Sequence, residues 1–287
     1  MCYNQEKDYR GENMFENIKL IICDIDGTLV VTHQTMSERA KAAVRKLQEH
    51  GILFGVASGR NIGDLKYITG TWGFDDLDVI VGLNGSELYD GIHNEVYKYF
   101  QMEPEWIKET FDIMRPFKHN PVMYHGKAYM CGVYDQKVHF SVQFTKSDFI
   151  VAKSEEDFYQ EPNAKIMFRV DEKDMPAVEA RAKEFESPYY KANKTQTTLM
   201  EFQNREASKA YALEQFCKLN GFGLENVVAF GDTTNDNEML EAAGIGVCMI
   251  NGSDDTKAKA DIITSKPVEE DGWVDFIENV FFKEKGW

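Results

Sequence analysis

The segment Lys19-Leu20-Ile21-Ile22-Cys23-Asp24-Ile25-Asp26-Gly27-Thr28 joins a short apolar run to a polar turn. A continuous apolar run such as Leu20–Cys23 is typical of a strand buried on both faces of a parallel sheet. Asp24 and Asp26 follow this run at positions i and i+2. Ligands of open α/β sheets bind outside the carboxyl ends of the strands, so both carboxylates are predicted at the ligand-binding edge.

Two carboxylates so close together repel each other, which favours a bound cation or a shared proton. One of them can attack phosphorus if a metal offsets the charge, while the other handles the proton of the leaving group. Gly27 lets the backbone turn, and the hydroxyl of Thr28 can meet an anion. The structural alternative is an Asx-type turn that caps the strand. An EF-hand loop is disfavoured, because Gly27 stands at position 4 and Thr35 at position 12, where that loop needs Gly at 6 and Glu at 12.

Strand and helix patterns alternate at both ends of the chain. Helix patterns include Ser37–His50, with Ser37 as a plausible N-cap and Gly51 as a C-terminal stop. This alternation predicts an α/β fold whose core is a Rossmann-like, doubly wound parallel sheet. Further apolar runs predict strands at Ile52–Ala57, Val79–Leu83, Val227–Phe230 and Ile245–Met249, and further helix patterns lie at Ala207–Leu219 and Asp236–Ala243.

The middle of the chain, from about Phe100 to Asn193, is rich in aromatic residues and has a different pattern. Its apolar residues alternate with polar ones, which predicts strands with one wetter face. We expect an inserted α+β cap domain at residues 89–195, with the core divided into residues 1–88 and 196–287. Residues 1–13 are expected to be flexible, and Met14 is a possible alternative start. The patterns are strands at Val138–Phe144 and Ala164–Val170, helices at Glu105–Phe117 and Lys173–Glu186, and a hairpin at Ser86–Tyr99 leading out of the core.

The composition limits the class of protein. A chain of 287 residues with 43% hydrophobic and 28% charged residues suits a globular protein of two domains. The net charge of −16 disfavours nucleic acid as a partner, since phosphate backbones are bound by basic surfaces. No run approaches the ~18 apolar residues of a membrane span, and no secretory signal is visible. Cys23 and Cys248 are interpreted as small core residues in a reducing compartment. We therefore expect a cytoplasmic protein without a membrane partner; the sequence does not determine its oligomeric state.

Three later segments carry further polar chemistry. Ser58-Gly59-Arg60 ends a predicted strand, where a hydroxyl and backbone N–H groups can hold phosphate oxygens; Arg60 more often pairs with a carboxylate. Lys209 lies in a predicted helix and can neutralise charge on a phosphate, although a lone helical lysine is usually solvated. Gly231–Asp236 places carboxylates and an amide after another predicted strand. Mg²⁺ prefers such hard oxygen ligands and keeps several waters, so carboxylates from two strand ends suit it.

These four segments, in this order, resemble the motifs of the haloacid dehalogenase superfamily of phosphatases. The long insertion between Ser58 and Lys209 is similar to that of its Cof-type branch, whose members have a large α/β cap over a Rossmann-like core. The resemblance covers the chain from about Ile18 onward. It departs from the usual pattern at Ala210, Gly252 and Thr233-Thr234, none of which removes a charged group.

The resemblance implies a role for each matching residue. Asp24 would be the nucleophile, and Asp26 would protonate the leaving alcohol and bind Mg²⁺ through its main-chain carbonyl. Lys209 would hold the phosphoryl group, and Asp232 would ligate Mg²⁺ together with Asp24. Thr28, Ser58, Gly59 and Asn235 are expected at the phosphate. Asp236 would support the metal site or orient Lys209, and Asn84 and Arg60 are the other supporting residues.

The expected function is a Mg²⁺-dependent phosphatase that acts on small phosphorylated metabolites through an aspartyl-phosphate. A phosphomutase or phosphotransferase with the same nucleophile is an alternative, and so is a weakly catalytic module that binds phosphorylated metabolites. Tyr124 and His125 are weak candidates for substrate contacts in the cap, where packing is the more frequent role of such residues. Sugar phosphates, a flavin or pyridoxal phosphate, and polyol phosphates all stay open as substrates.

Overall fold

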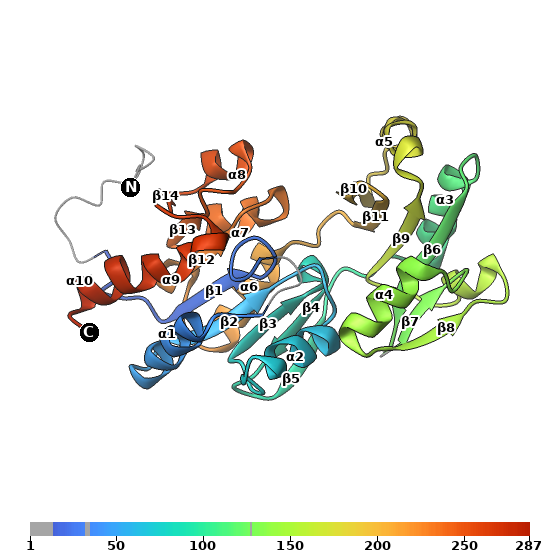
Figure 1. Ribbon diagram of the computed structural model, residues 1–287. Helices are drawn as coiled ribbons and strands as arrows, with labels where there is room; N and C mark the ends of the chain where they lie inside the picture. The colour runs from blue at the N-terminus through green and yellow to red at the C-terminus, as the bar shows by residue number, and fades with distance from the viewer. Residues whose placement is uncertain (1–13, 32–34, 127) are drawn as a thin grey trace. The chain divides into compact units, whose positions relative to one another are not determined.

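The computed structural model describes residues 14–31, 35–126 and 128–287 (Figure 1). These residues form two compact units, one made of the chain up to Tyr97 together with Ser208–Trp287, the other of Lys98–Ala207. The expectations for residues 1–13 lie outside the described residues. Among the helices that are described, none is long and apolar enough to cross a membrane.

The first unit contains an eight-stranded sheet in the order β14-β13-β12-β1-β2-β3-β4-β5. Six of these strands run parallel, and β4 turns back antiparallel to β3. The central strands are buried throughout, as their solidly apolar sequences require. The predicted α/β class with a parallel-sheet core is therefore confirmed. The strands are β1 (Leu20–Asp24), β2 (Leu53–Ala57), β3 (Val79–Gly82), β4 (Glu87–Asp90), β5 (Glu95–Lys98), β12 (Val227–Gly231), β13 (Ile245–Cys248) and β14 (Ile262–Ile263).

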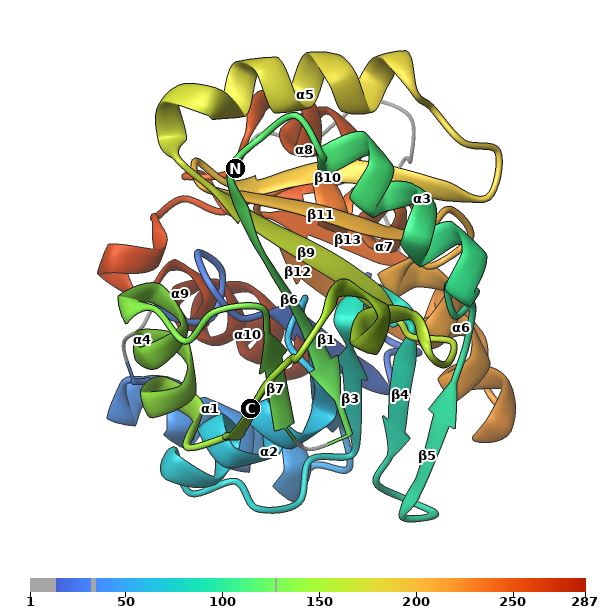
Figure 2. The same ribbon diagram turned by 90° about the vertical axis from the view of Figure 1, so that its right-hand side faces the viewer.

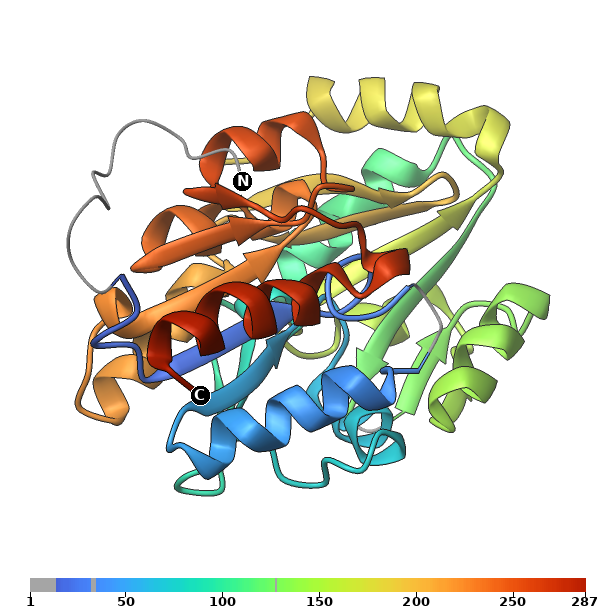
Figure 3. The same cartoon turned by 60° about the vertical axis from the view of Figure 1, so that its left-hand side comes forward.

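Helices cover both faces of this sheet. The chain moves from β1 toward β3 on one side and from β12 toward β14 on the other, so right-handed crossovers place α1 and α7 on opposite faces. Figure 3 shows α1 (blue) beside the C-terminal helices (dark red), which it contacts through α9. The helices are α1 (Glu38–Glu49), α2 (Ile62–Thr71), α6 (Lys209–Leu219), α7 (Asn237–Ala242), α8 (Asp254–Lys259), α9 (Gly272–Phe276) and α10 (Lys283–Lys285), with a π-helical turn at Ile277–Phe282.

The start of α1 follows the predicted capping chemistry. The Ser37 hydroxyl accepts a hydrogen bond from the Ala40 N–H at 3.1 Å, and Gly51 takes a φ of +75° just after the helix. Ala40, Ala43, Val44 and Leu47 are the buried face of this helix. The cysteines Cys23 and Cys248 are buried and unbridged, as predicted for small core residues.

The second unit is built on a six-stranded sheet in the order β10-β11-β9-β6-β7-β8, seen face-on in Figure 2. All its neighbouring strands are antiparallel except β7 and β8. α3 and α5 pack on one face over Met123, Ile166, Phe168 and Phe202, whereas α4 packs on the other over Val122 and Met167. The elements are α3 (Pro104–Met114), β6 (His119–His125), β7 (Ala128–Cys131), α4 (Gln136–Thr145), β8 (Asp148–Val151), β9 (Lys165–Val170), α5 (Met175–Glu184), β10 (Tyr190–Gln196) and β11 (Leu199–Asn204).

The prediction of a strand at Val138–Phe144 was wrong, because this segment is helix α4. Asp135 caps the helix by accepting the Val138 N–H at 2.8 Å, and Lys146 ends it in the left-handed conformation. Val138 and Val142 are buried, while Phe140 is exposed. A spacing of four puts the two valines on one helical face, and every-other-residue apolarity alone does not distinguish this from a strand.

The structure divides the two units after Tyr97 and after Ala207, whereas the sequence placed the divisions after residues 88 and 195. β4 pairs with β3 along its whole length, so the Ser86–Tyr99 hairpin extends the first sheet instead of leaving it. At the other end β11 pairs with both β9 and β10 and buries Met200 and Phe202 in the second unit. A boundary after residue 195 would cut through this hairpin.

Candidate active site

Asp24 and Lys209 are the central residues of a buried polar cluster in the first unit. Asp24 is the last residue of β1, and Lys209 is the first residue of α6, whose N-cap is Ser208. The Lys209 ammonium donates to Asp24 Oδ1 at 2.5 Å and to Asp236 Oδ1 at 2.6 Å. Lys209 is only 1% exposed, so the helix start holds one buried cation between the carboxylate that ends β1 and a carboxylate of the loop after β12.

Asp232 follows β12 and completes the cluster. Carboxylate oxygens of Asp24, Asp232 and Asp236 lie within 4.8 Å of one another. The Thr28 hydroxyl donates to Asp232 Oδ1 at 2.7 Å. Gly27 has a φ of +95°, and a Cβ there would lie 2.4 Å from Asp232 Oδ2, so this turn requires glycine for both its conformation and its space. From β1 the following strands are added toward β3, and from β12 they are added toward β14 on the other side. The cluster lies at the carboxyl ends of β1 and β12, where this order switches and where open α/β sheets bind ligands.

The charges in this cluster are not balanced. Burial raises the pKa of Asp24 well above its usual range; Lys209 opposes that shift, and the neighbouring carboxylates add to it. Burial likewise raises the pKa of Asp232 to about 6, against the hydrogen bond from Thr28. Burial by itself would lower the pKa of Lys209, but Asp236 and Asp24 outweigh it and raise that pKa. Among the residues that the structure describes, three carboxylates share one ammonium, so the cluster is short of positive charge.

Asp236 also organises the loop after β12. Its Oδ2 accepts the backbone N–H groups of Asp232 at 3.0 Å and Thr233 at 3.1 Å. One carboxylate thus fixes both the position of Asp232 and, through its other oxygen, the ammonium of Lys209.

Asp26 lies in the turn after β1 and is partly exposed. Its Oδ2 accepts a hydrogen bond from Arg60 Nη2 at 2.6 Å. The sequence left Arg60 between a carboxylate and a substrate, and in this structure a carboxylate holds it. The side chains of Asp24 and Asp26 therefore have different partners, a fully buried lysine for the first and a partly buried arginine for the second.

Ser58, Asn84 and Asn235 form a second chain of contacts in the first unit. Ser58 is buried at the end of β2, and its carbonyl accepts the Asn84 N–H at 3.0 Å. Asn84 takes a φ of +52°, and its Oδ1 accepts Asn235 Nδ2 at 3.2 Å. Gly59 is adjacent, since a Cβ there would lie 3.3 Å from Asn84 Oδ1. The structure thus brings together polar residues from three loops that are far apart in the sequence.

Two polar residues near these loops received no role from the sequence. Asp255 accepts hydrogen bonds from the Thr234 hydroxyl and from Asn237 Nδ2, both at 2.9 Å. Asn251 donates to the Gly27 carbonyl at 2.8 Å and accepts the Val268 N–H at 2.9 Å. They tie together the loops after β1, β12 and β13, and no local pattern around either residue indicates these long-range contacts.

Tyr124 and His125 lie at the end of β6 in the second unit. Tyr124 is half-buried and packs edge-on against Tyr129, with ring centroids 5.5 Å apart. His125 Nδ1 lies 3.6 Å from a carboxylate oxygen of Glu161. The ring contact of Tyr124 with Tyr129 is one of packing, and a substrate contact of Tyr124 or His125 stays a prediction.

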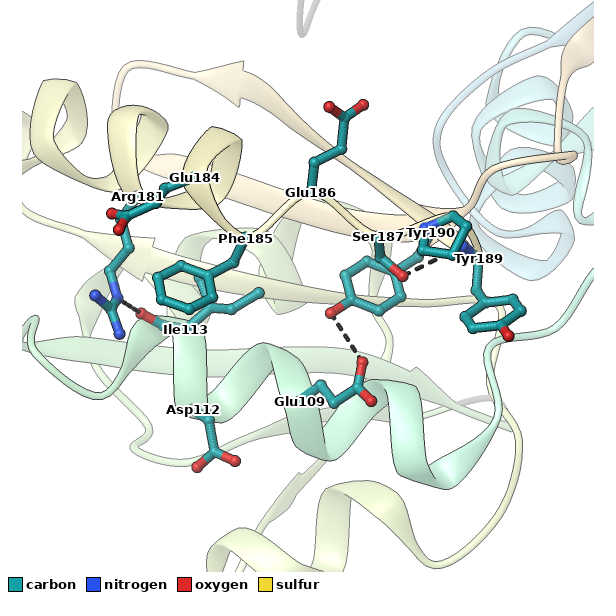
Figure 4. A pocket seen from close by; sticks show the side chains of 11 residues that line it. Glu109, Asp112, Ile113, Arg181, Glu184, Phe185, Glu186, Ser187, Tyr189 and Tyr190 are labelled. Carbon is teal, nitrogen blue, oxygen red and sulfur yellow. Dashed lines mark hydrogen bonds between the residues drawn. The ribbon is translucent and has the colours of Figure 1, made fainter.

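The second unit contains a cavity of about 570 Å³ between α3 and the segment after α5 (Figure 4). Two polar side chains at its wall bond within the unit: Arg181 Nε donates to the Ile113 carbonyl at 2.7 Å, and the Tyr190 hydroxyl donates to Glu109 at 3.1 Å. None of the expected site residues lines this cavity. The polar cluster of the first unit is therefore the candidate active site.

Comparison with known proteins identifies the family of the chain. A family model described as haloacid dehalogenase-like hydrolase matches residues 21–277. The chain belongs to this family. The predicted resemblance to the haloacid dehalogenase superfamily is thereby confirmed, and the chain is a phosphatase of that superfamily.

Relatives of known name are phosphatases of similar length. The chain is 26% identical over 259 residues to the 5-amino-6-(5-phospho-D-ribitylamino)uracil phosphatase YcsE of Bacillus subtilis, covering 88% of this chain and 92% of the relative. It is 25% identical to the pyridoxal phosphate phosphatase YbhA of Escherichia coli, covering 85% and 92%. A solved haloacid dehalogenase-like hydrolase from Bacteroides thetaiotaomicron has the same fold, with a TM-score of 0.81, 24% identity and coverage of 92% of this chain and all of the other.

Proposed function

We propose that this haloacid dehalogenase-like phosphatase hydrolyses phosphomonoesters of small metabolites with Mg²⁺ as cofactor and Asp24 as nucleophile. The observation that carries the proposal is the shortage of positive charge around Asp24, where three buried carboxylates share the ammonium of Lys209. A site that is anionic when empty cannot bind a phosphate ester unless a further cation enters with it.

The donor set fits Mg²⁺. Carboxylate oxygens are hard ligands, and those of Asp24 and Asp232 come from two neighbouring strand ends. We assign Asp24, Asp232 and the main-chain carbonyl of Asp26 to the metal. Bound there, Mg²⁺ would supply Lewis-acid stabilisation of phosphoryl charge. The Thr28 hydroxyl already donates to Asp232, so we assign Thr28 to holding this carboxylate in place of its expected contact with phosphate.

In the first step an oxygen of Asp24 attacks phosphorus, and the bond from phosphorus to the ester oxygen breaks. The product is an aspartyl-phosphate on Asp24 and a free alcohol. Lys209 is positioned to neutralise charge on the attacked group, since its ammonium lies 2.5 Å from the nucleophile and is anchored by Asp236. Ser58, Gly59 and Asn235 are assigned to the phosphoryl oxygens, with Asn84 orienting Asn235.

Asp26 is assigned to proton transfer. It would give a proton to the departing alkoxide and then take one from the water that hydrolyses the aspartyl-phosphate. Arg60 contacts Asp26 at 2.6 Å, so we assign it to orienting this side chain. The partial exposure of Asp26 supports exchange of its proton with water.

The names of the relatives support a small phosphorylated metabolite as substrate, since the two phosphatases named above act on a ribitylaminouracil phosphate and on pyridoxal phosphate. The net charge of −16 supports a small ligand over nucleic acid. A cytoplasmic location belongs to the same proposal, because such metabolites are found there.

A phosphate-release assay over a panel of metabolite esters tests the reaction. Release of inorganic phosphate with Mg²⁺ and without an acceptor is the expected result. Transfer or isomerisation of the phosphoryl group with little release would instead establish a phosphotransferase or mutase. Binding without turnover of any ester would establish a binding module.

Asp26→Asn tests the proton transfer separately. Turnover of alkyl phosphates is expected to fall much more than turnover of p-nitrophenyl phosphate, because only a poor leaving group needs protonation. Equal losses for both substrates would assign Asp26 to structure or to the metal alone.

A further inference from the structure

The turn after β1, residues 25–30, carries two of the groups assigned to the reaction, the carboxyl group and the main-chain carbonyl of Asp26. Hydrogen bonds within the turn close it locally. The Gly27 N–H donates to the Val30 carbonyl at 2.8 Å, and the Val30 N–H donates to the Ile25 carbonyl at 3.0 Å. The placement of this compact turn against the other carboxylates of the site depends on its contacts with other loops.

Three consecutive residues of the turn are each held by a different segment of the chain. The side chains on either side of Gly27 are bound by Arg60, which follows β2, and by Asp232, which follows β12. Between them, the carbonyl of Gly27 itself accepts a hydrogen bond from Asn251 Nδ2 at 2.8 Å. Asn251 follows β13 and holds the backbone of the turn, whereas the other two contacts hold its side chains.

The side chain of Asn251 has a fixed orientation. Its Oδ1 accepts the Val268 N–H at 2.9 Å, and since a backbone N–H can only donate, the amide must turn its Nδ2 toward the β1 turn. Two residues further on, the Ser253 N–H donates to the Asp232 carbonyl at 2.9 Å. Gly252 lies between them, where a Cβ would be 2.8 Å from that carbonyl oxygen. The loop after β13 therefore contacts both the turn after β1 and the loop that bears Asp232.

We propose that Asn251 is a positioning residue for the metal, which holds the Gly27 carbonyl and thereby fixes the direction of the Asp26 carbonyl. The inference rests on the proposed function, in which the Asp26 carbonyl binds Mg²⁺. A trans peptide points its N–H and its carbonyl to opposite sides, so the bond from the Gly27 N–H to Val30 sets the direction of the Asp26 carbonyl. Glycine has no side chain to restrict its rotation, so a bond at its carbonyl is needed to fix this backbone.

The affinity for Mg²⁺ tests this role. Asn251→Ala is expected to raise the Mg²⁺ dissociation constant about tenfold, because residues that orient metal ligands change affinity by about 10–100-fold when they are lost. Titration of the unfolding temperature with Mg²⁺ measures it. Asn279→Ala is the matched control and should bind as the wild type does, since Asn279 is also exposed and donates to Asp275 at 3.1 Å in the π-helical turn. Wild-type affinity in Asn251→Ala overturns the inference, whereas a wild-type protein indifferent to Mg²⁺ overturns the proposed function instead.

Hydrogen exchange of the metal-free protein tests the contact independently of Mg²⁺. Peptides that cover residues 25–30 are expected to exchange faster in Asn251→Ala than in the wild type, because the turn has lost its backbone contact with the loop after β13. Exchange of the same peptides should be unchanged in Asn279→Ala. Equal rates in Asn251→Ala and the wild type would show that the local bonds of the turn suffice, and would overturn the inference.

Asn251→Asp separates the two hydrogen bonds of this side chain. A carboxylate still accepts the Val268 N–H, but it has no hydrogen to donate to the Gly27 carbonyl. Residues 25–30 should therefore exchange as fast as they do in Asn251→Ala. Wild-type exchange in Asn251→Asp would assign the effect to the Val268 contact alone, as for a merely structural residue, and would contradict the positioning role.

A double variant with Thr28 tests whether both residues act on the same turn. The Thr28 hydroxyl holds the next residue of this turn on Asp232. The loss of Mg²⁺ affinity in Thr28→Val/Asn251→Ala should be smaller than the product of the two single losses, because the first change already releases the turn. Losses that multiply would show that the two residues act independently and would remove Asn251 from the positioning of this turn.

Discussion

Each of the two units contains a lysine buried almost completely from solvent, and the two lysines have opposite electrostatic surroundings. In the second unit Lys165 on β9 lies 2.7 Å from Glu201 on β11, with both side chains 3% exposed. In the first unit Lys209 lies between Asp24 and Asp236, with Asp232 beside them. One lysine meets one carboxylate across neighbouring strands, whereas the other meets an excess of carboxylates at a ligand-binding sheet edge.

The difference separates a structural ion pair from a catalytic one. A buried pair of equal and opposite charges needs nothing further from solution, and removing one partner leaves an uncompensated charge. A buried cluster with surplus negative charge is unfavourable by itself and becomes favourable when a cation binds. Burial of a charged residue is therefore weak evidence for function, while a local imbalance of charge is stronger evidence.

The largest difference in activity is expected when one carboxylate partner of each buried lysine is changed to its amide. Asp24→Asn should lower kcat for phosphate release by about 10⁴-fold or more, because an amide cannot form the aspartyl-phosphate. Glu201→Gln is the matched control in the second unit and keeps the nucleophile. Steady-state kinetics measure both; substantial residual turnover by Asp24→Asn would show that another group attacks phosphorus.

The same two variants should affect stability in the opposite order, with Glu201→Gln the more damaging of the two. Glu201→Gln is expected to lower the free energy of unfolding of the second unit by about 3 kcal/mol, since it leaves Lys165 charged and buried. Asp24→Asn should cause no loss in metal-free buffer, because it removes surplus negative charge. Urea titrations followed by hydrogen exchange of the peptides from residues 98–207 report on the second unit. Equal destabilisation by both changes would contradict the distinction between the two lysines.

Mg²⁺ should stabilise the first unit through the charge imbalance. At a concentration about 100 times its dissociation constant, Mg²⁺ is expected to add about 2.7 kcal/mol to the free energy of unfolding, and EDTA should reverse this. Asp232→Asn should lose the response, and Glu201→Gln should keep it. Thermal unfolding with and without Mg²⁺ provides the measurement. Indifference of the wild-type protein to Mg²⁺ would remove the metal from the proposed mechanism.

A smaller effect is expected from the hydroxyl that holds Asp232. Thr28→Val should weaken Mg²⁺ binding by about tenfold, because the 2.7 Å hydrogen bond orients a metal-binding carboxylate. Thr28→Ser keeps the hydroxyl and should bind nearly as the wild type does. Magnesium titrations of the unfolding temperature compare the two; if valine and serine behaved alike, the hydroxyl would have no part in positioning Asp232.

The first unit was predicted more accurately than the second, for a physical reason. Strands of its parallel sheet are buried on both faces, so runs such as Val227–Phe230 are solidly apolar and easily recognised. In the second unit one face of each strand or helix is less apolar, and the pattern of Val138–Phe144 suits a strand and a helix equally. The cap Asp135 and the left-handed Lys146 settled that segment as α4, and neither was considered in the sequence pattern.

The sequence by itself determined the α/β class, the family and the set of polar residues at strand ends, because these depend on local runs and on short motifs. The resemblance left Asp236 between the metal and Lys209, and the sequence favoured some carboxylate for Arg60. Only the tertiary structure decided the partner in each case: Lys209 for Asp236, Asp232 for Thr28, and Asp26 for Arg60. It also decided that Lys165 meets Glu201 and that Asn251 meets Gly27. Residues far apart in the chain meet only when strands align in register, so the balance of charge around a buried group is a property of the folded molecule.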